Sequence, residues 1–333
     1  MPRTSASYAA TRPNAATLHP RLLTSRLGKA STLPELLSLH QTHGSQFNGF
    51  HVGAFWSRFK KLARGELGGL SHRLVPMCEQ TVRILPELKA REVATIAHAF
   101  AKSRLVGSGP YQGVWVALEE VARRRLGDFN AQGLSMTAWA FATAGHASPG
   151  VFDALAAEVV RRGLGDFNQQ NLSNTAWAFA KANRAAPALF NVISAEVVQR
   201  GLGDFNAQGL VNTAWAFAKA GRAAPELFRA ISAEAVRRRL GGFNEQNCSN
   251  TAWAFATMGH GAPEKLPCTR MGTAASINGA GRIAHLPWLC PRSAVGYASK
   301  GSGGSRCAAL SVELVAMFRR RCRARKDFSS PNL

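Results

Sequence analysis

Several features are missing from this 333-residue sequence. It has no apolar run of about 18 residues, which argues against a membrane-spanning helix. Its six cysteines form no Cys-x-x-Cys pair, so scattered free thiols in a reducing compartment are expected rather than a zinc site or a disulfide framework. Phosphate-binding Gly-x-x-x-x-Gly-Lys loops, nucleophile elbows and His-Glu-x-x-His motifs are also missing. We therefore expect no enzyme activity, no metal site and no cofactor.

Acidic residues are scarce. The chain has 41 Lys plus Arg against 19 Asp plus Glu, a formal net charge of +22. This excess favours a polyanionic partner such as nucleic acid or an anionic membrane surface, with solubility or targeting as the alternative.

The N-terminal segment is free of acids before Glu35 and rich in Ser, Thr and Arg. This bias is typical of a mitochondrial or chloroplast transit peptide. A disordered basic arm that touches nucleic acid is the alternative. Residues 1–40 are accordingly predicted to be a transit peptide or disordered.

A tandem repeat dominates the middle of the chain. Four segments read FNAQGLSMTAWAFATAG, FNQQNLSNTAWAFAKAN, FNAQGLVNTAWAFAKAG and FNEQNCSNTAWAFATMG, and each starts 38 residues after the previous one. Such self-similarity indicates an array in which each unit buries its apolar face against its neighbours.

The first half of each repeat predicts a helix. Asn168 is a good N-cap, and Phe167 with Leu172 fits a hydrophobic staple. Leu172 and Phe179 fall on one buried stripe, at i and i+7. Trp177 points about 140° away from Leu172, so we expect it to pack on an adjacent hairpin as core rather than to serve as a stacking platform for bases.

The second half of each repeat predicts another helix. Pro187 suits its first turn, and Gly201 followed by Leu202 suits its C-terminal cap. Glu196 precedes Arg200 by four residues, a spacing that stabilises a helix and partly neutralises the arginine. Equivalent pairs recur in the neighbouring repeats, as Glu120–Arg124, Glu158–Arg162 and Glu234–Arg238.

The predicted fold is all-α, an α-solenoid of tandem helix-turn-helix hairpins with disordered N- and C-terminal segments. Residues 129–264 form three full repeats and one half repeat, and residues 41–128 form divergent capping repeats. Within the latter, residues 88–103 place His98 where the repeats have tryptophan, and residues 47–64 are a more divergent unit.

The array stops halfway through a hairpin, so Trp253 and Phe255 of its last helix are expected to be poorly covered. Residues 265–333 are predicted to be a basic, largely disordered tail with a helix from Ala308 to Arg323. A truncated or mis-spliced reading frame and a natural basic tail both remain open.

The 38-residue hairpin with NTAWAFA in its first helix resembles the octotricopeptide repeat proteins and the related FAST-kinase-like and RAP-domain proteins of algae and protists. The resemblance implies an organelle RNA-binding protein, in mitochondrion or chloroplast, that supports RNA processing, stability, rRNA maturation or translation. Organelle ribonucleoprotein proteins would then be further partners. The Pro-Pro-Pro-Glu-Trp box and a C-terminal RAP domain are missing, so nuclease-like activity is not carried over.

Single-stranded RNA suits such an array, because one repeat can address about one base while cations hold the backbone. Asn side chains can pair with base edges, or can instead form a structural ladder between repeats; Lys and Arg can neutralise phosphate, or can simply be solvated. The predicted RNA-binding residues are Asn174, Asn212, Asn250, Lys181, Lys219, Arg184, Arg222, His146 and His260. A protein-protein scaffold is the rival function, and a monomer that does not bind membranes is expected.

Overall fold

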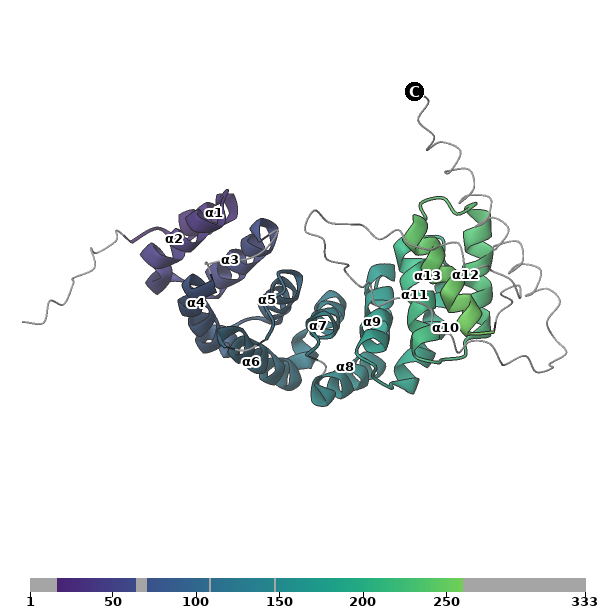
Figure 1. Ribbon diagram of the computed structural model, residues 1–333. Coiled ribbons are helices and arrows are strands. Elements are labelled where there is room, and N and C mark those ends of the chain that lie inside the picture. The colour runs from purple at the N-terminus through teal and green to yellow at the C-terminus, as the bar shows by residue number, and fades with distance from the viewer. Residues whose placement is uncertain (1–16, 64–70, 108, 147, 260–333) are drawn as a thin grey trace, which may run out of the picture. The chain divides into compact units, whose positions relative to one another are not determined.

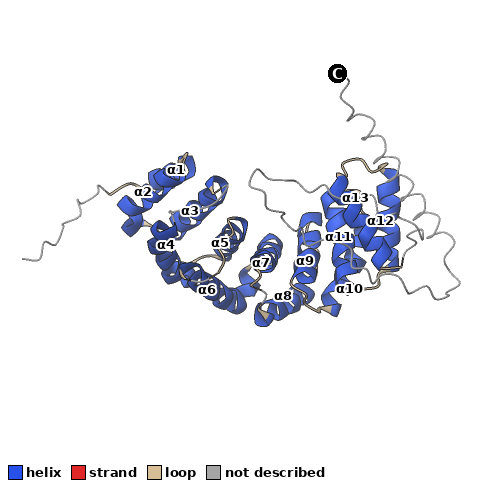
Figure 2. Ribbon diagram, viewed as in Figure 1, coloured by secondary structure: helices blue, strands red, loops and turns tan. Residues whose placement is uncertain are grey.

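The computed structural model describes residues 17–63, 71–107, 109–146 and 148–259 of the chain. In these ranges the regular structure is helical throughout, without strands, which confirms the all-α repeat prediction (Figure 2). The described residues fall into two compact units, divided between Val151 and Phe152.

The first unit contains successive helical hairpins. Its helices are α1 (Pro20–Lys29), α2 (Leu33–His43), α3 (Gly49–Leu62), α4 (Ser71–Ile84), α5 (Ala90–Lys102), α6 (Pro110–Arg125) and α7 (Ala131–Ala144), with short 3-10 turns at Gly44–Gln46, Leu85–Glu87 and Leu126–Asp128. The first helices of the hairpins, α1, α3, α5 and α7, pack side by side, and α4 packs on α6 in a second layer (Figure 1).

The second unit contains the most regular repeats. Its helices are most of α8 (Pro149–Arg162), then α9 (Gln169–Lys181), α10 (Pro187–Arg200), α11 (Ala207–Lys219), α12 (Pro225–Arg237) and α13 (Glu245–Thr257). Here α9, α11 and α13 pack side by side, and α10 packs on α12. We call α3, α5, α7, α9, α11 and α13 the A helices, and α4, α6, α8, α10 and α12 the B helices.

The A helices begin where the sequence predicts. The side chain of Asn168 accepts a hydrogen bond from the backbone N–H of Asn171, over 2.8 Å. Asn206 caps α11 in the same way, through the N–H of Gly209. Each cap satisfies one of the N–H groups that a helix leaves unpaired at its start. Asn48, Asn130 and Asn244 cap α3, α7 and α13 likewise.

Phenylalanines join each B helix to the next A helix in the second unit. Phe152 of α8 meets Phe179 of α9 edge to face, with ring centroids 5.1 Å apart. The same contact recurs one repeat later between Phe190 and Phe217, at 5.0 Å. Such T-shaped pairs add to the free energy of burial, so they fix each hairpin against its successor.

Arginines at the ends of B helices tie successive hairpins together. Arg238, which follows α12, donates to the carbonyl oxygens of Leu202 (2.9 Å), Gly203 (2.8 Å) and Phe205 (2.5 Å), in the turn before α11. Arg200 makes the equivalent bonds to the turn before α9. Charge-assisted bonds of this kind are stronger than neutral ones, and they satisfy carbonyls that the turn leaves open. We call this contact the arginine clasp.

Two expectations from the sequence are wrong. Residues 1–40 were predicted to be a transit peptide or disordered, but from Pro20 on they are largely helical, in α1 and α2, which bury Leu23, Leu27 and Leu36. Disorder of this part is therefore wrong, and the transit peptide stays a prediction. Phe255 is only 6% exposed instead of poorly covered, because Phe228 of α12 packs on its ring at 5.2 Å. The predicted tail 265–333, with its helix, lies outside the described residues.

Candidate nucleic-acid interface

Four positions of each A helix lie along its solvent side. In α9 they are Gln170, Asn174, Trp177 and Lys181, spaced so that they share one helical face. Gln170 and Lys181 are exposed, and Asn174 and Trp177 are half-buried. We call this the A face. Its equivalents are Gln208, Asn212, Trp215 and Lys219 in α11, Gln246, Asn250, Trp253 and Thr257 in α13, and Gln132, Met136, Trp139 and Thr143 in α7.

The tryptophans of the A face form a row in the second unit. The ring centroids of Trp177 and Trp215 lie 6.4 Å apart, and those of Trp215 and Trp253 lie 6.3 Å apart. Packing of Trp177 on an adjacent hairpin is thus confirmed. Trp215 is only 5% exposed, as expected of core, whereas Trp177 and Trp253 are half-buried. The row therefore supports the A helices and also leaves part of an aromatic surface open.

The predicted asparagines sit at this surface. Asn174, Asn212 and Asn250 are all half-buried. The Oδ1 of Asn212 accepts a hydrogen bond from Nε2 of Gln208, one turn earlier in the same helix, over 2.8 Å. The bond uses the amide oxygen of Asn212 as acceptor, so a base edge would have to accept a hydrogen bond from its NH₂ group. Base contact by these asparagines stays a prediction.

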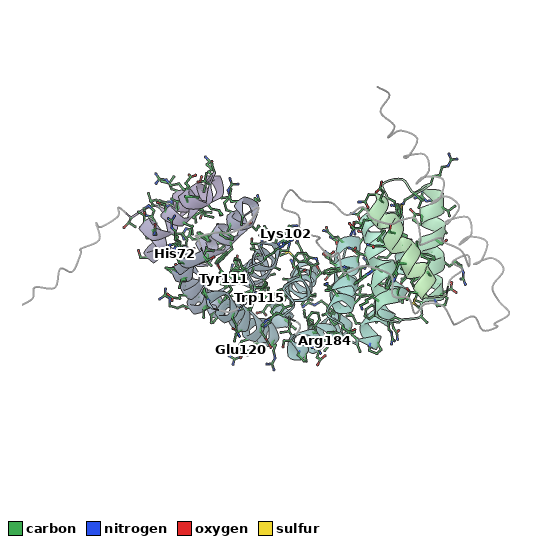
Figure 3. The ribbon with its side chains drawn as sticks, viewed as in Figure 1. His72, Lys102, Tyr111, Trp115, Glu120 and Arg184 are labelled. Carbon is green, nitrogen blue, oxygen red and sulfur yellow. The ribbon has the colours of Figure 1, made fainter. Side chains whose placement is uncertain are left out.

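The predicted lysines and loop residues lie in different surroundings. Lys181 and Lys219 are exposed at the ends of α9 and α11. Arg184 (Figure 3) and Arg222 occupy the following turns and are half-buried. Their backbone N–H groups each donate to a carbonyl in the last turns of the preceding helix, over 2.9 Å. The lysines are therefore better placed to meet a ligand than the arginines.

His146 occupies the equivalent turn after α7, where its half-buried side chain contacts residues of α6. Its Nε2 lies 3.3 Å from a carboxylate oxygen of Glu119, and its ring stacks on Trp115, with centroids 5.8 Å apart. The same carboxylate accepts a hydrogen bond from the Ser148 hydroxyl. These contacts favour a structural role for His146. His260, the last predicted residue, lies outside the described residues.

Charge separates between the two sets of helices. Helices α3, α7, α9 and α11 contain no Asp or Glu. The B helices carry acids, and the predicted i,i+4 pairs with arginine are all formed. Arg161 and Arg237 add second partners for Glu158 and Glu234, respectively. Hydrogen bonds from Arg237 and then Arg238 lower the pKa of the Glu234 carboxyl to about 2. Helices α3, α9 and α11 therefore carry lysines without an acid in the same helix, whereas the A helices α5 and α13 each contain one glutamate.

The first unit contains a basic cluster that the sequence analysis missed. Lys60 of α3 lies beside His98 of α5, which occupies the tryptophan position of its repeat as predicted. Lys60 precedes His98 by 38 residues. The repeat period itself was therefore the signal that could have revealed the pair.

Metal sites, membrane-spanning helices and reactive thiols are further features to consider in the described part of the chain. No cluster of three or more His, Cys, Asp or Glu suited to a metal ion occurs there. Nor is any helix of that part long and apolar enough to cross a membrane. Cys78 is buried, and burial raises the pKa of its thiol to about 12.

Fold and surface together define an α-helical repeat protein with a basic, partly aromatic face. Comparison of the chain with protein-family models and with curated proteins gives no match in either case.

Proposed function

We propose that this protein binds single-stranded RNA along the A face, as an organelle RNA-binding repeat protein similar to the octotricopeptide family. The observation that carries the proposal is the difference in charge between the A helices α9 and α11 and the B helices. A polyanion meets lysines on α9 and α11, which lack acids, whereas the B helices offer arginines already paired with glutamates.

The kind of polyanion follows from the rest of the A face. The half-buried ring of Trp177 and the Gln and Asn amides accompany the lysines. Unpaired bases can stack on aromatic rings and bond through their edges, whereas a duplex hides both. This combination favours a single strand over duplex DNA. From the family resemblance we further propose that the protein acts in mitochondrion or chloroplast, where it supports RNA processing, stability, rRNA maturation or translation.

The test is binding of the full chain to randomised single-stranded RNA over a salt series, with duplex DNA as competitor. Binding weakens with salt, and each phosphate contact contributes about −0.7 to the slope of log K against log salt for a single strand. The double variant Lys181→Ala/Lys219→Ala should therefore make this slope less negative by about 1.4.

The matched control removes the same charge from B helices. Arg161→Ala/Arg237→Ala deletes two exposed arginines that pair with Glu158 and Glu234. This variant should leave the salt slope unchanged. If both double variants reduced the salt dependence of binding equally, overall charge rather than the A face would be responsible for RNA binding. Absence of binding at low salt would reject the proposal and favour a protein-protein scaffold.

A further inference from the structure

The basic cluster of the first unit joins three successive A helices. Nζ of Lys60, on α3, lies 3.4 Å from Nδ1 of His98, on α5. The His98 ring in turn lies 5.1 Å from the ring of Trp139, on α7, between centroids. Lys60, His98 and Trp139 are all half-buried, and each therefore keeps a part open to solvent.

Two more lysines belong to this cluster. Lys102 follows His98 by four residues and therefore lies on the same face of α5. Lys61 follows Lys60, and its charge adds to the effect of burial in lowering the pKa of Lys60. Burial, and then the charges of Lys60 and Lys102, lower the pKa of His98 to about 4. His98 is therefore neutral at pH 7.

The hydrogen bond fixes which nitrogen of His98 carries the proton. The Lys60 ammonium can only donate, so Nδ1 accepts, and Nε2 bears the proton. The cluster then offers the ammonium groups of Lys60 and Lys102 and the imidazole N–H of His98. This donor set suits an anion with several acceptor oxygens.

The acidic side chains of the helices around this cluster make contacts away from its lysines. Neither α3 nor α7 contains one. Glu92 of α5 has its side chain against Gly53, near the start of α3. On α6, Glu119 bonds Ser148 and His146, and Glu120 pairs with Arg124. The positive charge of the cluster is thus left for a ligand.

We propose that Lys60, Lys102 and the Nε2–H of His98 bind the terminal phosphate of an RNA strand, with Trp139 beside the last nucleotide. The inference rests on the proposed RNA-binding function. A phosphate monoester carries a charge of about −1.5 to −2 and three strong acceptor oxygens, whereas an internal diester carries a single charge. Helices α9 and α11 present one lysine each, which suits internal diesters.

The first test compares one RNA sequence with a 5′-phosphate, a 3′-phosphate or hydroxyls at both ends. The full chain should bind one phosphorylated form about tenfold more tightly than the hydroxyl form, the equivalent of one charge-assisted hydrogen bond. Lys60→Gln/Lys102→Gln should abolish the preference. Arg83→Gln, which removes an exposed charge from the B helix α4, should preserve it.

The second test reads the site directly, by NMR titration of His98. A bound dianion should raise the pKa of His98 by about 1–3 units, since an opposite charge nearby favours the protonated ring. Adenosine 5′-monophosphate should produce this rise in the wild type but not in Lys60→Gln/Lys102→Gln. Adenosine, which has no phosphate, should leave the pKa at about 4.

The outcomes separate this inference from the proposed function. If RNA binds through Lys181 and Lys219 but end phosphates change neither affinity nor the pKa of His98, the terminal-phosphate site is wrong and the function stands. If no RNA binds but adenosine 5′-monophosphate still shifts His98, the function fails and the phosphate site stands. An equal shift with inorganic phosphate alone would reduce the cluster to a general anion site and overturn the nucleotide assignment.

Discussion

The arginine clasp makes a quantitative prediction about stability. Replacing Arg238 by Met keeps the aliphatic stem and removes three hydrogen bonds to the turn before α11. A hydrogen bond that involves a charged group contributes about 1.5–3 kcal/mol. The Gly203 carbonyl belongs to an exposed residue and can be rehydrated, whereas Leu202 and Phe205 are buried. We therefore expect the free energy of unfolding to fall by about 2–4 kcal/mol.

The neighbouring Arg237 provides the matched control. Both arginines bond Glu234, but the Arg237 side chain is 66% exposed and that of Arg238 only 17%. Arg237→Met should unfold as the wild type does. Urea unfolding, followed by circular dichroism at an unchanged m-value, measures the difference. If the two variants unfold at the same urea concentration, the clasp does not hold the hairpins together.

Three further predictions concern a cap, a histidine and a thiol. Asn206→Ala removes the bond to the Gly209 N–H and should cost about 1 kcal/mol in urea unfolding, whereas an unchanged midpoint would contradict the cap. His98 has a pKa of about 4, below its unfolded value of 6.5, so its contribution to stability is complete above pH 6.5 and is lost as pH falls towards 4. His98→Gln should reduce this acid destabilisation, and an identical pH profile would refute the assignment. Cys78, with a pKa of about 12, should react with iodoacetamide at pH 8 only after unfolding; rapid labelling of the native chain would show that it is accessible.

The repeat hairpins could be predicted because their signals are local. Asn168 caps α9, Pro187 opens α10 and Gly201 ends it with a φ of 77°, all within a few residues of the boundaries that they set. The period of 38 residues then extends each assignment to its neighbours. Pairs such as Glu196–Arg200 were equally visible, because four residues along a helix bring side chains together.

The features that sequence reasoning missed depend on partners far along the chain. The carbonyls that Arg238 bonds lie 33 to 36 residues earlier and carry no side-chain signature. His146 looks like a variable loop cation until Glu119 and Trp115, from α6, are found beside it. In residues 1–40 the arginine and serine bias concealed two helices whose leucines pack in the core.

Photochemical cross-linking tests the central claim most directly. The full chain would be cross-linked to single-stranded RNA containing 4-thiouridine, and the modified peptides would be mapped by mass spectrometry. The A face predicts cross-links within α9 and α11, near Trp177, Lys181 and Lys219. Cross-links confined to the B helices or to residues 265–333 would contradict it.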